Sequence, residues 1–317
     1  MPEKVKILIT YRGLRERYIQ QIREISERIE VEMIPDGGSI LNAVRDAEVI
    51  FGDFSKEMFF ASKKIKWIQV VSAGVDRYLF PEIVESDVIL TSTTGMHRIP
   101  MSELVLAMML TLAKQLHRFV RLQSEGKWKR INTEELAGKT VGIIGFGNVG
   151  NETAAKAKCF GMRVLAIDIE TIRRPTYVDE ILGPDDLDYA LRKSDYLVMT
   201  VPLTEKTHHM IGERELRLMK PTAYVVNVAR GAVIDNEALL RALKEGWIAG
   251  AGLDVFEQEP LPQNSGFWKL DNVVITPHIG GSSRQYQKRS VKIFCENLRR
   301  YLEGKPLMNM VDKKAGY

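Results

Sequence analysis

Residues 140–168 constrain the fold most strongly, because they place three glycines between an apolar strand and a helix. The stretch reads TVGIIGFGNVGNETAAKAKCFGMRVLAID, and Gly145, Gly147 and Gly150 have the spacing G-x-G-x-x-G. Three such glycines recur by chance in turns, but here an apolar run precedes them, an alanine-rich segment follows, and a second apolar run ends on Asp168. This order predicts a strand–helix–strand unit of a parallel sheet.

Each part of this unit has a physical task in holding a dinucleotide. The first glycine permits a tight turn, the second lets backbone N–H groups approach a pyrophosphate, and the third lets the helix pack closely on the strand. The helix N-terminus adds partial positive charge. Asp168 can accept hydrogen bonds from the adenosine ribose, and its charge repels a 2′-phosphate, which favours NAD. Arg173 and Arg174 follow shortly after and leave NADP open as an alternative.

The rest of the chain alternates apolar strand-like runs with helical patterns. In the first third, strands are expected within 5–10, 47–53, 65–74 and 87–93, with a helix over 18–29. From residue 140 onward about six strands follow, which is the number in a complete dinucleotide-binding sheet. Strands separated by helices form parallel sheets that are covered on both faces, so the pattern predicts an α/β fold.

A chain of 317 residues exceeds what one hydrophobic core usually organises, so two domains are expected. A long apolar helix over 101–122 precedes the second series of strands. The last helical pattern, 291–304, is too short to fold alone and is expected to pack back on the first domain. The predicted domains are therefore a discontinuous substrate domain, 1–98 plus 284–317, and a dinucleotide-binding domain, 99–283.

Composition narrows the classes of partner. The net charge of +4 is small for this length, and 45 Lys and Arg alternate with 41 Asp and Glu, which gives no basis for a nucleic-acid surface. The longest apolar run, 104–113, is about half a membrane span. Two widely separated cysteines fit no metal spacing and are typical of a reducing compartment. We expect a cytoplasmic protein that binds neither membrane, nucleic acid nor metal.

Three polar side chains follow apolar strands of the second series. Arg230 follows YVVNVA directly, Glu259 lies in the loop after AGLDVF, and His278 follows NVVITP. Because the carboxyl ends of parallel strands meet at one edge, we expect all three to converge where a nicotinamide ring would lie. Histidine can deliver a proton near neutral pH, a neighbouring carboxylate orients the imidazole, and an arginine binds a carboxylate through two contacts. Together they predict the reduction of a keto acid by hydride transfer.

Several stretches that carry these residues resemble one family in the right order along the chain. They are VSAGVD, ELAGKTVGIIGFGNVG, VPLTEKTHHMI, NVARGAVID, GAGLDVFEQEPLP and TPHIGG. The chain resembles the D-isomer-specific 2-hydroxyacid dehydrogenases, the group that contains phosphoglycerate, glyoxylate and hydroxypyruvate reductases. The resemblance implies two Rossmann-like, doubly wound parallel-sheet domains with the active site in the cleft between them, and a homodimer formed through residues 101–136.

The resemblance also implies roles for individual residues. Arg230 would bind the substrate carboxylate and carbonyl, His278 would donate the proton with Glu259 as its partner, and the backbone of Ala73 and Gly74 would hold the carboxylate. Further positions would line the dinucleotide together with the glycine loop and Asp168: Asn148, Val149, Pro202, Thr207, Val228, Ala229, Asp254 and Gly280.

The expected reaction interconverts a small 2-keto acid, such as glyoxylate or hydroxypyruvate, and its D-2-hydroxy acid with NAD(H). Phosphite oxidation on the same scaffold is one alternative; formate oxidation is disfavoured, because Glu259 stands where formate enzymes usually carry an amide. The other alternative is an NADH-sensing binding protein that resembles the C-terminal-binding-protein corepressors and keeps the same three residues. No long disordered tail or basic segment supports that alternative.

Overall fold

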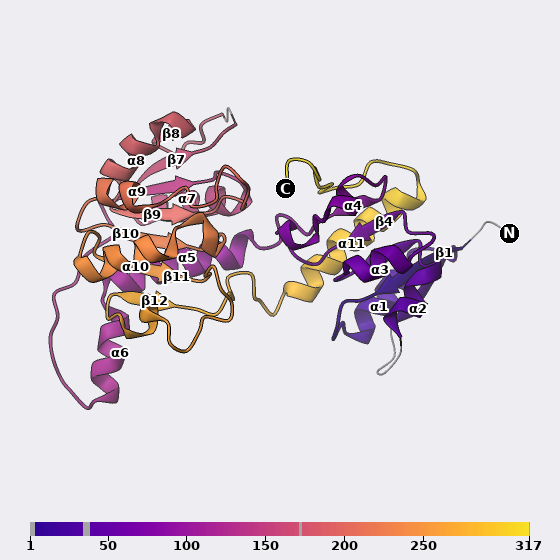
Figure 1. The fold of residues 1–317 in the computed structure, drawn as a ribbon, viewed down its shortest axis with the longest axis horizontal. Helices are drawn as coiled ribbons and strands as arrows, with labels where there is room; N and C mark the ends of the chain where they lie inside the picture. The colour runs from indigo at the N-terminus through magenta and orange to yellow at the C-terminus, as the bar shows by residue number, and fades with distance from the viewer. Residues whose placement is uncertain (1–3, 34–38, 171–172, 317) are drawn as a thin grey trace. The chain divides into compact units, whose positions relative to one another are not determined.

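The structure of the protein, a computed structural model, describes residues 4–33, 39–170 and 173–316. The chain forms two compact units (Figure 1). Unit 1 combines Met1–Met96 with Ser283–Tyr317, and unit 2 is the continuous segment His97–Ser282. The chain therefore passes from one unit to the other next to residues 96 and 282, close to the boundaries expected at 98 and 283.

Unit 1 is built on a parallel sheet in the order β2-β1-β3-β4-β5. Its strands are β1 (Val5–Ile9), β2 (Ile29–Met33), β3 (Val49–Phe51), β4 (Trp67–Gln69) and β5 (Ile89–Thr91). The helix predicted over 18–29 is wrong in its second half. The helix ends at Arg23, and Ile29 begins the edge strand β2, whose apolar residues pack against the core through pairing with β1.

Helices cover both faces of this sheet. They are α1 (Glu16–Arg23), α2 (Ile40–Ala43), α3 (Lys56–Ala61), α4 (Pro81–Val84) and α11 (Tyr286–Leu302). On one face, α1 and α11 enclose a core in which Phe294 stacks between Phe51 and Trp67, at ring-centroid distances of 4.1 and 5.2 Å. The C-terminal helix therefore completes the core of the unit that the N-terminal strands begin.

Unit 2 contains a larger parallel sheet in the order β12-β11-β10-β9-β6-β7-β8. Its strands are β6 (Thr140–Ile144), β7 (Arg163–Ile167), β8 (Glu180–Leu182), β9 (Tyr196–Met199), β10 (Tyr224–Asn227), β11 (Gly250–Leu253) and β12 (Val273–Ile275). Six correspond to the predicted series. The additional strand, β8, is an edge strand that is only half-buried, so no run of apolar residues marks it in the sequence.

The helices of unit 2 lie on both sides of this sheet. They are α5 (Arg98–Ala113), α6 (Leu116–Ser124), α7 (Asn148–Cys159), α8 (Leu187–Lys193), α9 (Glu213–Leu218) and α10 (Asn236–Glu245). The helix α5 contacts α7, β10 and β11. The buried residues of α8, α9 and α10 belong to a separate core, distinct from the core that contains α5 and α7. Both faces of the sheet are therefore buried, as its near-continuous apolar strands require.

The long apolar helix expected over 101–122 is broken in two. Gln115 has a left-handed backbone, with φ +54°, and the axes of α5 and α6 differ by 67° across this break. Among the described residues, no single helix is long and apolar enough to span a membrane; only α5 and α6 counted together across the bend reach that length and hydropathy. The helix α5 is buried along much of its length, whereas α6 has no buried residue.

Candidate active site

The glycine loop joins β6 to α7 with the geometry that its spacing predicts. Gly145 has φ +92°, and a Cβ atom there would lie 2.8 Å from the amide nitrogen of Val201. A Cβ on Gly150 would lie only 2.1 Å from the carbonyl oxygen of Gly145. At Gly147, in contrast, a Cβ would meet no atom within 4 Å. The loop is thus closed where the helix packs on the strand and open where a phosphate would approach.

The N-terminus of α7 is suited to an anion. Gly147 is its N-cap, Asn148 and Val149 begin the first turn, and that turn contains no acidic residue. Asp168 follows β7, and its Oδ2 atom accepts a hydrogen bond of 2.6 Å from the backbone N–H of Phe146 inside the glycine loop. The Asp168 carboxylate therefore lies beside the loop, where it can also accept hydrogen bonds from a ribose.

The two arginines after Asp168 differ in their contacts. The guanidinium of Arg174 donates to the carbonyl oxygens of Val178 and Asp179, at 3.1 and 2.9 Å. Arg173 is exposed, and residues 171–172 before it lie outside the described residues. Arg174 is therefore occupied by its own loop, which weakens the case for a 2′-phosphate contact from that residue.

The side chains of His278 and Glu259, which the sequence predicts to act together, are in contact. The Nδ1 atom of His278 lies 2.7 Å from Oε2 of Glu259, and Oε1 of Glu259 accepts a hydrogen bond of 3.0 Å from the backbone N–H of Phe256. The two side chains are 48% and 36% exposed, respectively. Because Glu259 holds Nδ1, the other ring nitrogen, Nε2, is the atom able to exchange a proton with a ligand.

His278 has a left-handed backbone, with φ +52°, which is uncommon for a residue other than glycine. Asp254, only 2% exposed, supports this conformation from the end of β11. Its carboxylate accepts hydrogen bonds from the side chain of Thr276, at 2.5 Å, and from the backbone N–H groups of Ile279 and Gly280, at 2.9 and 2.8 Å. Its carbonyl oxygen also accepts from the N–H of His278, at 2.8 Å. The buried carboxylate therefore shapes the loop that carries the histidine.

Arg230 follows β10 and is brought to the same edge by close backbone packing. A Cβ on Gly231 would lie 1.9 Å from the backbone carbon of Phe256, so the arginine loop lies directly against the segment that leads to Glu259. The guanidinium of Arg230 donates to the carbonyl oxygen of Ala229 at 2.8 Å. Arg230, Glu259 and His278 thus follow the neighbouring strands β10, β11 and β12 at one edge of the sheet.

Sequence reasoning missed Asn227, the last residue of β10. This side chain is 2% exposed; its Oδ1 accepts from the N–H of Ala229 at 3.0 Å, and its Nδ2 donates to the carbonyl oxygen of Arg230 at 3.0 Å. It therefore fixes the turn that presents the arginine. The sequence did offer a signal, because Asn227 is a polar residue at the end of the apolar run YVVN. A buried amide needs hydrogen-bond partners, so such a residue is expected to hold a nearby turn.

The remaining predicted dinucleotide positions lie on loops at the same carboxyl edge. Thr207 closes the loop after β9 by donating to the carbonyl oxygen of Pro202 at 2.6 Å. Val228 and Ala229 are buried in the turn after β10, and Gly280 is buried against Asp254. None of these positions is displaced to the amino edge of the sheet.

His208 and His209 stack on each other after Thr207, with ring centroids 4.0 Å apart. The Nε2 atom of His209 lies 3.0 Å from Oε1 of Glu257. This contact joins the loop after β9 to the loop after β11, so both histidines have a structural explanation that requires no reaction.

Ala73 and Gly74 belong to unit 1, in the loop after β4. The hydroxyl of Ser72 donates to the carbonyl oxygen of Gly74 at 2.8 Å, and the N–H of Thr93 donates to the carbonyl oxygen of Ser72 at 3.1 Å. Both residues are half-buried. The loop is thus held by its own hydrogen bonds at the carboxyl edge of the smaller sheet.

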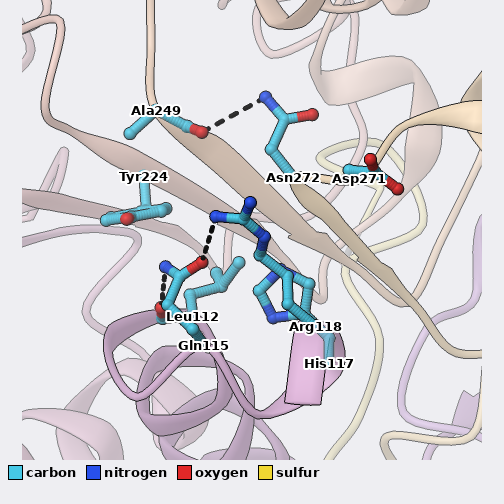
Figure 2. A pocket seen from close by; sticks show the side chains of 8 residues that line it. All are labelled: Leu112, Gln115, His117, Arg118, Tyr224, Ala249, Asp271 and Asn272. Atoms are coloured by element: carbon cyan, nitrogen blue, oxygen red, sulfur yellow. Dashed lines mark hydrogen bonds between the residues drawn. The ribbon is translucent and has the colours of Figure 1, made fainter. Parts of the chain in front are cut away.

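A cavity of about 330 Å³ lies at the opposite, amino edge of the unit 2 sheet (Figure 2). Its wall contains the start of β10, the residues that precede β11 and β12, and the break between α5 and α6. The lining residues are Leu112, Gln115, His117, Arg118, Tyr224, Ala249, Asp271 and Asn272. Burial lowers the pKa of His117 below its usual 6.5, so the imidazole is neutral near neutral pH. The cavity contains none of the residues predicted to act in the reaction.

Comparison with known proteins agrees with the site. The family model described as D-isomer specific 2-hydroxyacid dehydrogenase, NAD binding domain, matches residues 106–280. The chain is 36% identical over 328 residues to a glyoxylate reductase of Thermococcus litoralis, and the match covers 98% of this chain and 97% of that protein.

Two solved structures show the same fold across nearly the whole chain. A D-isomer specific 2-hydroxyacid dehydrogenase family protein from Aeromonas salmonicida matches with a TM-score of 0.89 at 29% identity, covering 98% of this chain and 100% of that one. An NADPH-dependent glyoxylate/hydroxypyruvate reductase from Sinorhizobium meliloti, solved with NADP and sulfate, matches with a TM-score of 0.84 at 26% identity, covering 99% and 100%.

Proposed function

Because the chain belongs to the D-isomer-specific 2-hydroxyacid dehydrogenase family, we propose that it reduces a small 2-keto acid to the D-2-hydroxy acid. The protein is an NAD(P)-dependent oxidoreductase of 2-keto and 2-hydroxy acids. Glyoxylate and hydroxypyruvate are the proposed substrates, since relatives over nearly the full length are named for them. The observation that carries the proposal is the His278–Glu259 contact of 2.7 Å beside the arginine loop.

His278 is the proposed proton donor. Reduction of a ketone places negative charge on the carbonyl oxygen, and the imidazolium can deliver a proton to that oxygen from Nε2. Glu259 orients the ring through Nδ1, which turns Nε2 toward the substrate side. In the reverse direction the neutral imidazole takes the proton from the hydroxyl. A positioned acid of this kind accelerates the reaction by about 10²–10⁴-fold.

Arg230 and the loop of Ala73 and Gly74 are the proposed carboxylate-binding groups. A guanidinium can hold a carboxylate through two parallel hydrogen bonds and polarise the adjacent carbonyl. The backbone N–H groups of the 73–74 loop can supply further donors. These contacts hold the carboxylate, and the proton donated by His278 fixes the carbonyl oxygen, so that one face of the carbonyl would be turned toward the hydride and the D isomer would form.

The residues around the glycine loop fit a dinucleotide. There is open space above Gly147, no acidic residue stands in the first turn of α7, and the Asp168 carboxylate lies beside the loop. When bound, the dinucleotide supplies the hydride in the reduction and accepts it in the reverse direction. Asp168 would bind the ribose hydroxyls, and its negative charge would disfavour the 2′-phosphate. We therefore propose that NAD(H) is preferred over NADP(H).

A substrate panel with single variants tests these assignments. The wild type is assayed with glyoxylate, hydroxypyruvate, pyruvate and phosphite, each with the appropriate form of NAD and NADP. His278→Gln is expected to reduce kcat by about 10²–10⁴-fold with every accepted keto acid. Arg230→Gln is expected to raise KM and lower kcat together, because both binding and polarisation are lost.

The matched control is His117→Gln, which changes another histidine of unit 2 at the opposite edge of the sheet. This variant should keep its turnover. Full turnover by both Arg230→Gln and His278→Gln would refute the proposed roles. Oxidation of phosphite without reduction of any keto acid would select the phosphite alternative, and binding of NADH without any turnover would select the corepressor-like one.

We also propose a cytoplasmic homodimer formed through residues 101–136. The exposed side of α6 carries Leu116 and Val120, and Trp128 beyond it is 99% exposed. Cys159 and Cys295 are both free thiols, which fits a reducing compartment. Light scattering of the wild type and of Val120→Asp tests the dimer: the variant is expected to be monomeric, and a monomeric wild type would refute the assignment.

A further inference from the structure

A second group of charged side chains lies at the carboxyl edge of the unit 1 sheet. After β3 the chain turns sharply at Gly52, which has φ +133°; a Cβ there would lie 2.4 Å from the backbone nitrogen of Tyr11. The hydroxyl of Thr10 donates to the carbonyl oxygen of Asp53 at 2.5 Å. These contacts hold Asp53 beside the end of β1 and next to the loop that follows β4.

Asp53 joins two residues of that loop. Nη2 of Arg77 donates to Oδ1 of Asp53 at 2.5 Å, and the hydroxyl of Tyr78 donates to the same oxygen. The guanidinium carbon of Arg77 lies 4.6 Å from the centre of the Tyr78 ring, which stacks in turn on Phe54 at 5.0 Å. Tyr78 is 3% exposed, whereas the side chains of Asp53 and Arg77 are each 62% exposed. The Asp53–Arg77 pair therefore packs on the buried Tyr78 and Phe54 rings, while its charged atoms remain accessible to a ligand.

The contacts of Asp53 leave its carboxylate able to accept another hydrogen bond. Burial, and then the hydrogen bond to Asp53, raise the pKa of Tyr78, so its hydroxyl remains a donor over the physiological range. Among the described residues, no group donates to the second carboxylate oxygen, Oδ2. A ligand at this edge would meet an acceptor whose charge is already shared with an arginine.

We propose that Asp53 and Arg77 select the substituent at C3 of the 2-keto acid, favouring a neutral hydroxyl over a methyl group or a second anionic group. This inference rests on the function proposed above, in which Ala73 and Gly74 hold the substrate carboxylate. Arg77 follows Gly74 by three residues in the same loop, and Asp53 is bonded to Arg77. The proposal places the next carbon of a substrate held by that loop beside the pair.

The chemistry of the pair discriminates among three kinds of substituent. A C3 hydroxyl can donate to Oδ2 of Asp53, whereas a methyl group offers no donor and leaves the carboxylate without a ligand partner. A carboxylate or phosphate at the same position meets the negative charge of Asp53. Arg77 offsets only part of that repulsion, because its Nη2 atom is bonded to Oδ1 and the ligand would approach the other oxygen, Oδ2.

The test compares kcat/KM for hydroxypyruvate, pyruvate and oxaloacetate, with glyoxylate as a reference substrate without C3. Asp53→Ala is expected to lower the hydroxypyruvate-to-pyruvate ratio by about tenfold, since one hydrogen bond to a charged group is lost. The same variant should raise the oxaloacetate-to-pyruvate ratio by about tenfold, because Arg77 is then unpaired. Asp53→Asn keeps an acceptor but removes the charge, so it should retain much of the hydroxyl preference while the rejection of oxaloacetate is lost.

The control variant is Glu82→Gln, which breaks the exposed Lys56–Glu82 ion pair of 2.7 Å in the same unit and should leave every ratio unchanged. Thermal melting confirms that each variant is folded, and if Asp53→Ala is not, the Asp53→Asn ratios decide. Wild-type protein that reduces no 2-keto acid would refute the proposed function itself. Turnover with ratios that are unchanged in folded Asp53 variants would overturn only the selection of the C3 substituent.

Discussion

The two parallel sheets of this protein have a similar strand order around their first strand, but they differ in the turn that follows that strand. In unit 1, β1 lies between β2 and β3; in unit 2, β6 lies between β7 and β9. Such a reversal of strand order is where open α/β sheets bind ligands. After β6 the chain uses three glycines, whereas after β1 it reads TYRGLRERY, with the Tyr11 ring packed edge-on against Phe51 at 5.9 Å.

The helices that follow these strands differ in charge. The first turn of α1 contains Glu16, whose carboxylate compensates the partial positive charge of the helix N-terminus. The first turn of α7 contains no acidic residue and follows the exposed Gly147. The partial positive charge at the N-terminus of α1 is therefore compensated by Glu16, whereas that of α7 is available to bind an anionic ligand. Strand order determines where a ligand can bind, but the turn residues determine whether one does.

The largest effect is expected from closing the glycine loop. Gly150→Ala puts a methyl carbon 2.1 Å from the carbonyl oxygen of Gly145, so helix and strand must separate. The free energy of unfolding should fall by about 1–3 kcal/mol, as for other overpacked sites. NADH binding should weaken at the same time. Chemical denaturation and fluorescence titration measure the two quantities.

Gly147→Ala separates these two effects, because a methyl group there meets no protein atom within 4 Å. Stability should stay within about 0.5 kcal/mol of the wild type while NADH binding still weakens. Equal binding of NADH by the wild type and by Gly147→Ala would contradict the assignment of this space to the dinucleotide.

A smaller effect is expected when α7 is made to resemble α1. Asn148→Glu places a carboxylate in the first turn of α7, near the proposed pyrophosphate. Coulomb repulsion of about 1 kcal/mol at close range in this exposed turn, near the value for bulk water, should weaken NADH binding by up to about tenfold. Asn148→Gln is the neutral control, and calorimetric titration of both variants measures the difference. Identical dissociation constants for the two variants would show that the charge of the first turn of α7 does not control NADH binding.

Asp168→Asn tests the residue after β7, the second strand of unit 2 along the chain, as a determinant of cofactor choice. The substitution removes the charge beside the glycine loop and leaves an amide in its place. The NADH-to-NADPH ratio of kcat/KM should fall by about tenfold, equivalent to about 1.4 kcal/mol. Arg174→Gln, which alters a residue bonded to the carbonyls of Val178 and Asp179, should leave the ratio unaltered. A ratio that depends on Arg174 and not on Asp168 would reverse the interpretation.

The smallest effect is expected in unit 1. Glu16→Gln removes the charge at the start of α1 and its exposed ion pair with Arg23. The free energy of unfolding should fall by only about 0.3–1 kcal/mol, the usual contribution of a charge at a helix terminus. Cofactor binding should not change, which thermal melting with and without NADH would establish. An altered affinity for NADH would mean that the two helix ends are less independent than proposed.

The parallel sheets and the His278–Glu259 pair could be predicted because each rests on a local signal. Buried parallel strands are continuously apolar, and polar residues that follow them lie at one edge by necessity. Two edge strands, β2 and β8, lack a continuous apolar run. β2 alternates apolar and acidic residues directly after a helical pattern, and β8 has only three residues, so pairing with β1 and β7 is what defines both strands. The break between α5 and α6 likewise lies within a continuous helical pattern.

The supporting residues were harder to predict than the reacting ones. His278 and Glu259 are recognisable by the chemistry of their side chains, but the buried Asp254 and Asn227 act by holding backbone turns. Most of their partners are backbone N–H and carbonyl groups, which nearly every residue possesses. Sequence alone therefore indicates that a buried polar group needs partners, and only the fold identifies them.

The position of α11 has a consequence for synthesis on the ribosome. The strands of unit 1 emerge first, yet the core between them and α11 contains Val291, Phe294 and Leu298, which are translated after all of unit 2. Unit 2 is a continuous segment and can fold as soon as it leaves the exit tunnel. Until then α1 covers only part of that face of the N-terminal sheet. A chain truncated before residue 291 should therefore keep a folded unit 2 and expose apolar surface on unit 1, where it can aggregate.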